Sequence, residues 1–167
     1  MTPKLAALYR RVDELRRLWR VSMCPIDPFL ICDGLPDVTL REFPFASTNM
    51  NASLVACEDG GYLITLNSRR TLREQAFDCA HELMHYALHP RGGISDSECE
   101  WQADQGALEL LIPRDVLLHR IDLCRPALTG SNRRRFLSAQ ANFFGVTEAV
   151  FRRRLEQVHS ESRGLHW

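Results

Sequence analysis

Long apolar segments are missing from this chain of 167 residues, and no stretch is apolar enough to span a bilayer. The first 20 residues, MTPKLAALYRRVDELRRLWR, carry charged side chains throughout and contain neither an apolar block nor a small-residue cleavage site. They therefore lack the features of a secretory signal. These absences predict a cytoplasmic protein that has no membrane partner.

Cysteine pairs of the C-x-x-C type are also absent, although the chain has six cysteines. We expect free thiols in a reducing compartment, most of them small core residues. Net charge is zero, because 21 basic and 21 acidic side chains cancel. The charges are unevenly spread: residues 1–112 carry a net −5 and residues 113–167 a net +5. A basic C-terminal segment is compatible with nucleic acid or an acidic partner, and equally with an ordinary helical surface.

Repeats and low-complexity tracts are absent, and a composition of 45% apolar and 25% charged residues is typical of a globular protein. Apolar residues recur at helical spacing over residues 4–19, and Asp27 is placed to cap a short helix over residues 28–33. Three strands follow, with a hairpin turn at residues 58–61 between the last two. The predicted strands are 38–43, 52–57 and 62–66. The sequence thus predicts a small antiparallel sheet in a mostly helical α+β fold.

Helices dominate the remainder of the chain. Residues 72–88 contain no Gly or Pro, and their apolar side chains recur at helical spacing. A second helix is predicted over residues 97–111, where Pro113 stops it, and a third begins after that proline. The glycine-containing loop between residues 88 and 97 allows the first two helices to fold against each other.

The C-terminal part has a different pattern. Residues 125–133 (RPALTGSNR) resemble a linker, so we divide the chain into a first domain, 1–124, and a C-terminal segment, 125–167. The segment is predicted to form two helices, separated by a turn at Gly145 and a cap at Thr147. This order is typical of a helix-turn-helix.

The sequence HELMH lies inside the helix predicted at residues 72–88. Residues four apart in a helix share a face, so His81 and His85 can direct two imidazoles at one metal ion. Glu82 lies at the edge of that face, where it can act as a general base toward a water that zinc activates. The bare motif also arises by chance on surface helices. Here it places a polar face on a helix whose other apolar side chains are expected to form the core, which favours a metal site.

A catalytic zinc ion requires a third protein ligand and one open position. His89 lies one further turn along a straight helix, too far to close a tetrahedral site. Glu100 is on the next predicted helix, which is mostly apolar, and is the preferred ligand. Asp104 follows on the same face, placed to hold the outer nitrogen of one histidine. The candidates considered were His89, Asp96, Glu98, Glu100 and Asp104.

Three separated segments resemble the ImmA/IrrE family of metallopeptidases: YLITLNSRRTLREQAFDCAHELMHYALH, then ECEWQADQGALELLIP, then FFGVTEAVFRRRL. They occur in the family's order and cover roughly residues 55–157. Two positions depart from the family pattern. Met84 replaces the glycine that usually precedes the second histidine, and Gly106 replaces a phenylalanine on the following helix. Neither change touches a predicted ligand.

The resemblance implies a gluzincin-like site in which His81, His85 and Glu100 hold Zn²⁺ and Glu82 is catalytic. It also implies a function, because family members are typically encoded by prophages and mobile elements or act in stress responses. There they cleave a helix-turn-helix repressor and so release transcription. We therefore expect a zinc-dependent endopeptidase whose partner is such a repressor.

Two other classes of function remain open. The basic C-terminal helices favour a DNA-binding transcriptional regulator with a structural or vestigial zinc site. Apolar residues in the last helix and the zero net charge make nucleic acid the less favoured partner. A protein-binding module without catalysis is the third reading. The intact HExxH segment opposes it, because a binding surface needs no water-activating carboxylate.

Overall fold

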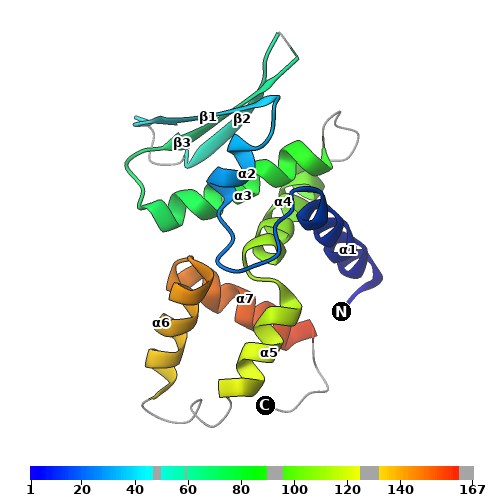
Figure 1. Cartoon of the computed structure of the whole chain (residues 1–167), viewed down its shortest axis with the longest axis vertical. Coiled ribbons are helices and arrows are strands. Elements are labelled where there is room, and N and C mark those ends of the chain that lie inside the picture. Colours follow the sequence, from blue (N-terminus) through cyan, green and yellow to red (C-terminus); the bar gives the residue numbers. More distant parts are fainter. Residues whose placement is uncertain (47–49, 59, 90–95, 125–131, 162–167) are drawn as a thin grey trace.

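The computed structural model describes residues 1–46, 50–58, 60–89, 96–124 and 132–161. Figure 1 shows the sheet and α3 at one end of the molecule, α5, α6 and α7 at the other, and α4 between them. The bounds of these elements are α1 Pro3–Leu18, α2 Pro28–Asp33, β1 Val38–Phe43, β2 Ala52–Ala56, β3 Tyr62–Asn67, α3 Leu72–Leu88, α4 Asp96–Leu111, α5 Arg114–Cys124, α6 Asn132–Phe144 and α7 Glu148–Glu161. A mostly helical α+β fold is therefore confirmed. None of the described helices combines the length and apolar character that crossing a membrane requires.

The sheet is mixed, so the predicted antiparallel sheet is only partly correct. Its order is β1-β3-β2, with β2 antiparallel to β3 as the hairpin predicts, but β1 is parallel to β3. A hairpin fixes only the two strands that it joins. Residues 44–51, which connect β1 to β2, can span about 26 Å, and skipping one strand needs only about 10 Å. The central position goes to β3, whose Ile64 and Leu66 are fully buried.

The helix α3 has the predicted bounds and a well-defined start. The Thr71 side chain accepts from the backbone N–H of Glu74, and the Glu74 carboxylate accepts from the backbone N–H of Thr71. This capping box satisfies backbone donors that a helix start leaves unpaired. Leu83 and Met84 are fully buried between the sheet and the other helices. The helix that carries the HELMH segment is thus fixed at its start and along its apolar side.

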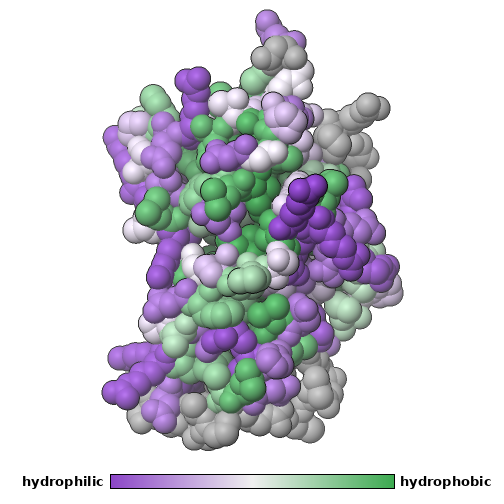
Figure 2. Space-filling view, viewed as in Figure 1, coloured by the Kyte–Doolittle hydropathy of each residue, from purple (hydrophilic) through white to green (hydrophobic). Residues whose placement is uncertain are grey.

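The first helix packs on α4 with one face. Val12 is completely buried, whereas Arg10, Arg11 and Arg17 are exposed, as the predicted amphipathic pattern requires. Hydrophilic side chains accordingly cover the outer side of α1 in Figure 2. The ammonium group of Lys4 adds a contact 4.5 Å from the centre of the Trp101 ring on α4.

The C-terminal helices α6 and α7 join through a short turn. Gly145 has φ +70°, a conformation that favours glycine, and Thr147 accepts from the backbone N–H of Val150 to cap α7. Phe144 and Phe151 stack across the pair with ring centres 6.0 Å apart. The two predicted helices are confirmed, although α6 begins inside the predicted linker, whose residues 125–131 lie outside the described ranges. The domain division and the helix-turn-helix character stay predictions.

A buried ion pair ties α7 to the rest of the protein. Arg154 is fully buried and pairs with Glu109 of α4, while its guanidinium also donates to the carbonyl oxygen of Ile112 at 3.1 Å and to the hydroxyl of Tyr9 on α1 at 2.6 Å. A buried charge is tolerated only when it is paired and hydrogen-bonded. This network therefore fixes α7 against α1 and α4, next to the helices that carry the predicted site.

Candidate metal centre

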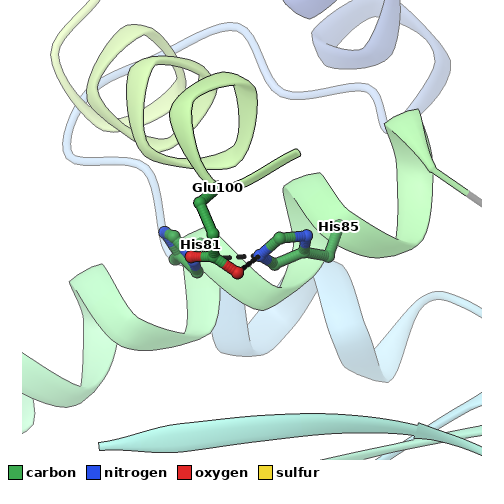
Figure 3. Close-up of side chains that lie close together, drawn as sticks. All are labelled: His81, His85 and Glu100. Carbon is green, nitrogen blue, oxygen red and sulfur yellow. Dashed lines mark hydrogen bonds and ion pairs between the residues drawn. The ribbon is translucent and has the colours of Figure 1, made fainter. Parts of the chain in front are cut away.

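Two neighbouring helices bring together the three predicted metal ligands. Figure 3 shows His81 and His85 side by side on α3, with the carboxylate of Glu100 reaching them from α4. The Nε2 atoms of the histidines are 3.0 Å apart. The carboxylate oxygens of Glu100 are 3.3 Å from each of these nitrogens. Among the described residues, these three form a group whose ligand atoms all lie within 4.8 Å of one another.

These separations fit a tetrahedral metal ion. Histidine and carboxylate ligands lie about 2.0–2.2 Å from zinc, so two ligand atoms of a tetrahedral site are about 3.3 Å apart. The observed 3.0–3.3 Å agrees with that spacing. The donor set of two nitrogens and one oxygen also suits zinc and leaves a fourth position open. The assignment of these residues as ligands remains a prediction that the geometry supports.

The electrostatics of the site favour the neutral imidazoles that bind metals. Burial lowers the pKa of both His81 and His85, and the charge of His85 lowers that of His81 further. The carboxylate of Glu100 opposes these effects by raising both values. The positive charge of Arg153, on α7, also lowers the pKa of His81. An imidazole must be unprotonated to bind a metal ion, so lowered pKa values extend binding to lower pH.

Glu82 and His81 both lie on the wall of one pocket. Burial raises its pKa to about 7, and the negative charges of Glu100 and Asp78 add to that shift. A carboxyl group with a pKa near neutrality is suited to accept and return a proton. A divalent cation at the three ligands would lower this pKa, because its positive charge favours the carboxylate.

The pocket has a volume of about 450 Å³. One wall comes from α3, one from Asp104 of α4, and one from the start of β2. The residues that line it are Met50, Asn51, Ala52, Phe77, Asp78, His81, Glu82 and Asp104. The buried side chain of Asn67, at the end of β3, donates to the carbonyl oxygen of Met50 at 3.2 Å. This contact fixes the β2 wall relative to α3, which follows the same strand.

Three of the four other candidates for the third ligand are engaged in other contacts, and the fourth is exposed. The Nε2 atom of His89 is 3.2 Å from the side-chain oxygen of Gln102. Glu98 pairs with Lys4, and Asp96 is exposed at the first residue of α4. Asp104 lies on the pocket wall as an ion-pair partner of Arg153, and its carboxylate also accepts from Gln105 at 3.3 Å. Its predicted role toward a histidine stays a prediction.

Arg153 and the β2 wall were not identified from the sequence. The only sequence signal at Arg153 is the basic run Arg152–Arg154, which is typical of nucleic-acid contacts and does not indicate a pocket. Tyr86 follows a predicted ligand in sequence, but its hydroxyl donates to the carboxylate of Asp37 at 2.9 Å. Sequence proximity to the HELMH segment therefore does not reveal which side chains reach the pocket.

The two departures from the family pattern meet in space. Met84 is fully buried, and a Cβ atom added at Gly106 would lie 2.8 Å from its sulfur and 2.9 Å from its Cγ. The bulk that Met84 adds on α3 thus occupies the space that a side chain at position 106 would need on α4. Met84 is not among the residues that line the pocket.

The chain matches a known protein family over most of its length. The family model of peptidase M78, described as the IrrE N-terminal-like domain, matches residues 35–156, which is more than two thirds of the chain. A search of curated proteins gave no match. The matched region includes the strands, both helices of the candidate metal centre and most of α7. The chain therefore belongs to the ImmA/IrrE family of metallopeptidases.

Proposed function

We propose that this protein is a zinc-dependent endopeptidase that cleaves a helix-turn-helix transcriptional repressor. The observation that carries the proposal is the arrangement of His81, His85 and Glu100 at tetrahedral spacing, with Glu82 on the pocket side of the same helix. Membership of a metallopeptidase family supports the same chemistry. The metal identity, the repressor and the cytoplasmic location are parts of the proposal, and the family resemblance is the ground for the repressor.

The residues of the pocket can be given distinct roles in peptide hydrolysis. A bound zinc ion supplies a Lewis acid, which makes water a stronger nucleophile at neutral pH and polarises a carbonyl group. Glu82 takes a proton from the attacking water on its carboxylate. It then gives that proton to the nitrogen of the departing amine. The half-buried environment of Glu82 keeps bulk water from competing for this proton.

The shape of the site suits cleavage within a chain. The strand β2 is at the edge of the sheet, and Ala52 at its start also lines the pocket. An extended peptide can add to such an edge through main-chain hydrogen bonds and pass the metal ligands at the same time. This geometry favours a substrate segment of the repressor that is extended or that unfolds locally into an extended form.

DNA binding has less support. Within the basic C-terminal helices, Arg153 and Arg154 pair with carboxylates of α4 rather than lying free on the surface of α7. Phe151 and Val158 of the same helix are buried. Arg133, Arg134 and Arg135 on α6 are exposed, and a salt-sensitive shift of duplex DNA at physiological ionic strength would favour this alternative.

The test of the proposal is proteome-wide identification of cleavage sites. Zinc-loaded wild type, Glu82→Gln and the control Glu98→Gln are each incubated with a bacterial lysate, and new protein N-termini are identified by mass spectrometry. We expect new N-termini within helix-turn-helix repressors for the wild type and the control. Loss of a general base should reduce them by about 10²–10⁴-fold in Glu82→Gln. Equal cleavage by Glu82→Gln would refute the mechanism, and no cleavage by zinc-loaded wild type would refute the function.

A further inference from the structure

A cation from α7 lies beside the pocket, one helical turn away from the predicted metal ligands. Arg153 forms an ion pair with Asp104 of α4, and its guanidinium carbon lies 5.8 Å from the centre of the Phe77 ring on α3. Phe77 precedes His81 by one turn, and Asp104 follows Glu100 by one turn. Both partners of Arg153 line the pocket that His81 and Glu82 also line. Arg153 thus spans the two ligand-bearing helices at the pocket.

The contacts of Arg153 orient it while leaving donors available. A guanidinium carries five N–H donors, and one carboxylate occupies at most two of them in a bidentate pair. The carboxylate of Asp104 is in turn held by the amide of Gln105. The side chain of Arg153 is 46% exposed, so its remaining donors are accessible from solvent, next to the two pocket-lining residues that it contacts.

Peptide hydrolysis needs a group of this kind. As the water oxygen adds to the carbonyl carbon, negative charge develops on the carbonyl oxygen, and a preformed hydrogen-bond donor stabilises it. We propose that Arg153 donates an N–H to the carbonyl oxygen of the scissile peptide bond, with Asp104 as its positioning residue. The inference rests on the proposed peptidase function. In this step the water oxygen bonds to the carbonyl carbon and one water proton goes to Glu82. The carbon–nitrogen bond then breaks, and that proton passes to the leaving amine.

Other donors near the site are less well placed. The hydroxyl of Tyr86 is directed to Asp37, and His119 is exposed on α5. Arg70 donates from Nε to Asp78 at 2.6 Å. Asp78 lies one turn before Glu82 on α3, so Arg70 is on the side of the general base rather than on the side of Glu100.

The experiment compares two metal-binding probes on the cobalt-substituted protein, whose visible spectrum reports binding at the metal. Benzylphosphonate presents a tetrahedral anion with an oxygen free for a second donor, whereas benzohydroxamate chelates the ion through both of its oxygens. We expect Arg153→Met to weaken benzylphosphonate by at least about 10-fold, because a charge-assisted hydrogen bond is lost, and to change benzohydroxamate by less than about 3-fold. Asp104→Asn should act in the same direction with a smaller effect.

Control variants and a kinetic measurement accompany the two probes. Arg152→Met, at the neighbouring exposed position that pairs with Glu148, should change neither probe. The proposal would be overturned if Arg153→Met weakened both probes equally or changed neither. It would also be overturned if Arg70→Met, rather than Arg153→Met, weakened benzylphosphonate selectively. A cobalt-loaded wild type that binds neither probe would contradict the peptidase function as well. With a cleavable substrate, kcat/KM of Arg153→Met should fall about 10²–10³-fold while metal content is unchanged.

Discussion

Because Met84 packs against Gly106, we expect Gly106→Ala to destabilise the protein, whereas Gly→Ala inside a helix normally stabilises it. In the middle of a helix, Gly→Ala normally stabilises by about 1 kcal/mol. At Gly106 the added Cβ atom would lie 2.8 Å from the sulfur of Met84, well inside ordinary contact. Overpacking of this kind costs about 1–3 kcal/mol. We therefore expect Gly106→Ala to lower the free energy of unfolding by up to about 2 kcal/mol.

The same substitution should become favourable once the methionine is shortened. Met84→Ala removes the sulfur and Cγ and leaves a Cβ atom 3.6 Å from the new one, an ordinary contact. Met84→Ala alone should cost about 2–5 kcal/mol, because the side chain is fully buried. In that background, Gly106→Ala should stabilise by about 1 kcal/mol, which gives a coupling energy of about 1–3 kcal/mol.

Urea unfolding of the wild type, both single variants and the double variant, all metal-free in the same buffer, measures this coupling. Equal effects of Gly106→Ala in the two backgrounds would refute the packing relation between α3 and α4.

Two further predictions concern stability. Arg154→Met should lower the free energy of unfolding by about 3–5 kcal/mol, because it removes the charged partner of the buried Glu109 carboxyl group, and Arg154→Met with Glu109→Leu should recover most of that loss. Urea unfolding measures both, and a loss below about 1 kcal/mol in the single variant would contradict the assigned pairing. The second prediction is pH dependence at the start of α3, where hydrogen bonds from Thr71 lower the pKa of Glu74 below its ordinary 4.5. A carboxyl group with a lowered pKa contributes stability that is complete above pH 4.5 and is lost as pH falls through the lower value. The difference in unfolding free energy between wild type and Glu74→Gln should therefore shrink below pH 4.5, and a difference independent of pH would count against the capping box.

Local patterns predicted most of the secondary structure. The bounds of α2 and α3 agree with the expected 28–33 and 72–88, because Asp27 and Thr71 cap them and no Gly or Pro interrupts them. The direction of β1 could not be predicted. Hairpin chemistry determines only the neighbour across a tight turn, and the choice of the central strand depends on which strand the rest of the protein buries.

The sequence predicted which side chains of α3 and α4 come together, but not the residues that surround them. Helical spacing placed His81 and His85 on one face, and the apolar character of the next helix favoured Glu100 over the other carboxylates. Arg153 was not predicted, because it comes from a helix distant in sequence and reaches the pocket only through the packing of α7. The partner of Asp104 was missed for the same reason. Pairing between distant helices depends on tertiary contacts that periodicity does not encode.

If His81, His85 and Glu100 form a metal site, the metal content of the purified protein will depend on them. Wild type, His85→Ala, Glu100→Ala and Glu82→Gln are purified without chelators and analysed by elemental mass spectrometry. We expect about one zinc ion per chain in wild type and in Glu82→Gln, and its loss from the two ligand variants. No metal in wild type, or full metal content in both His85→Ala and Glu100→Ala, would contradict it.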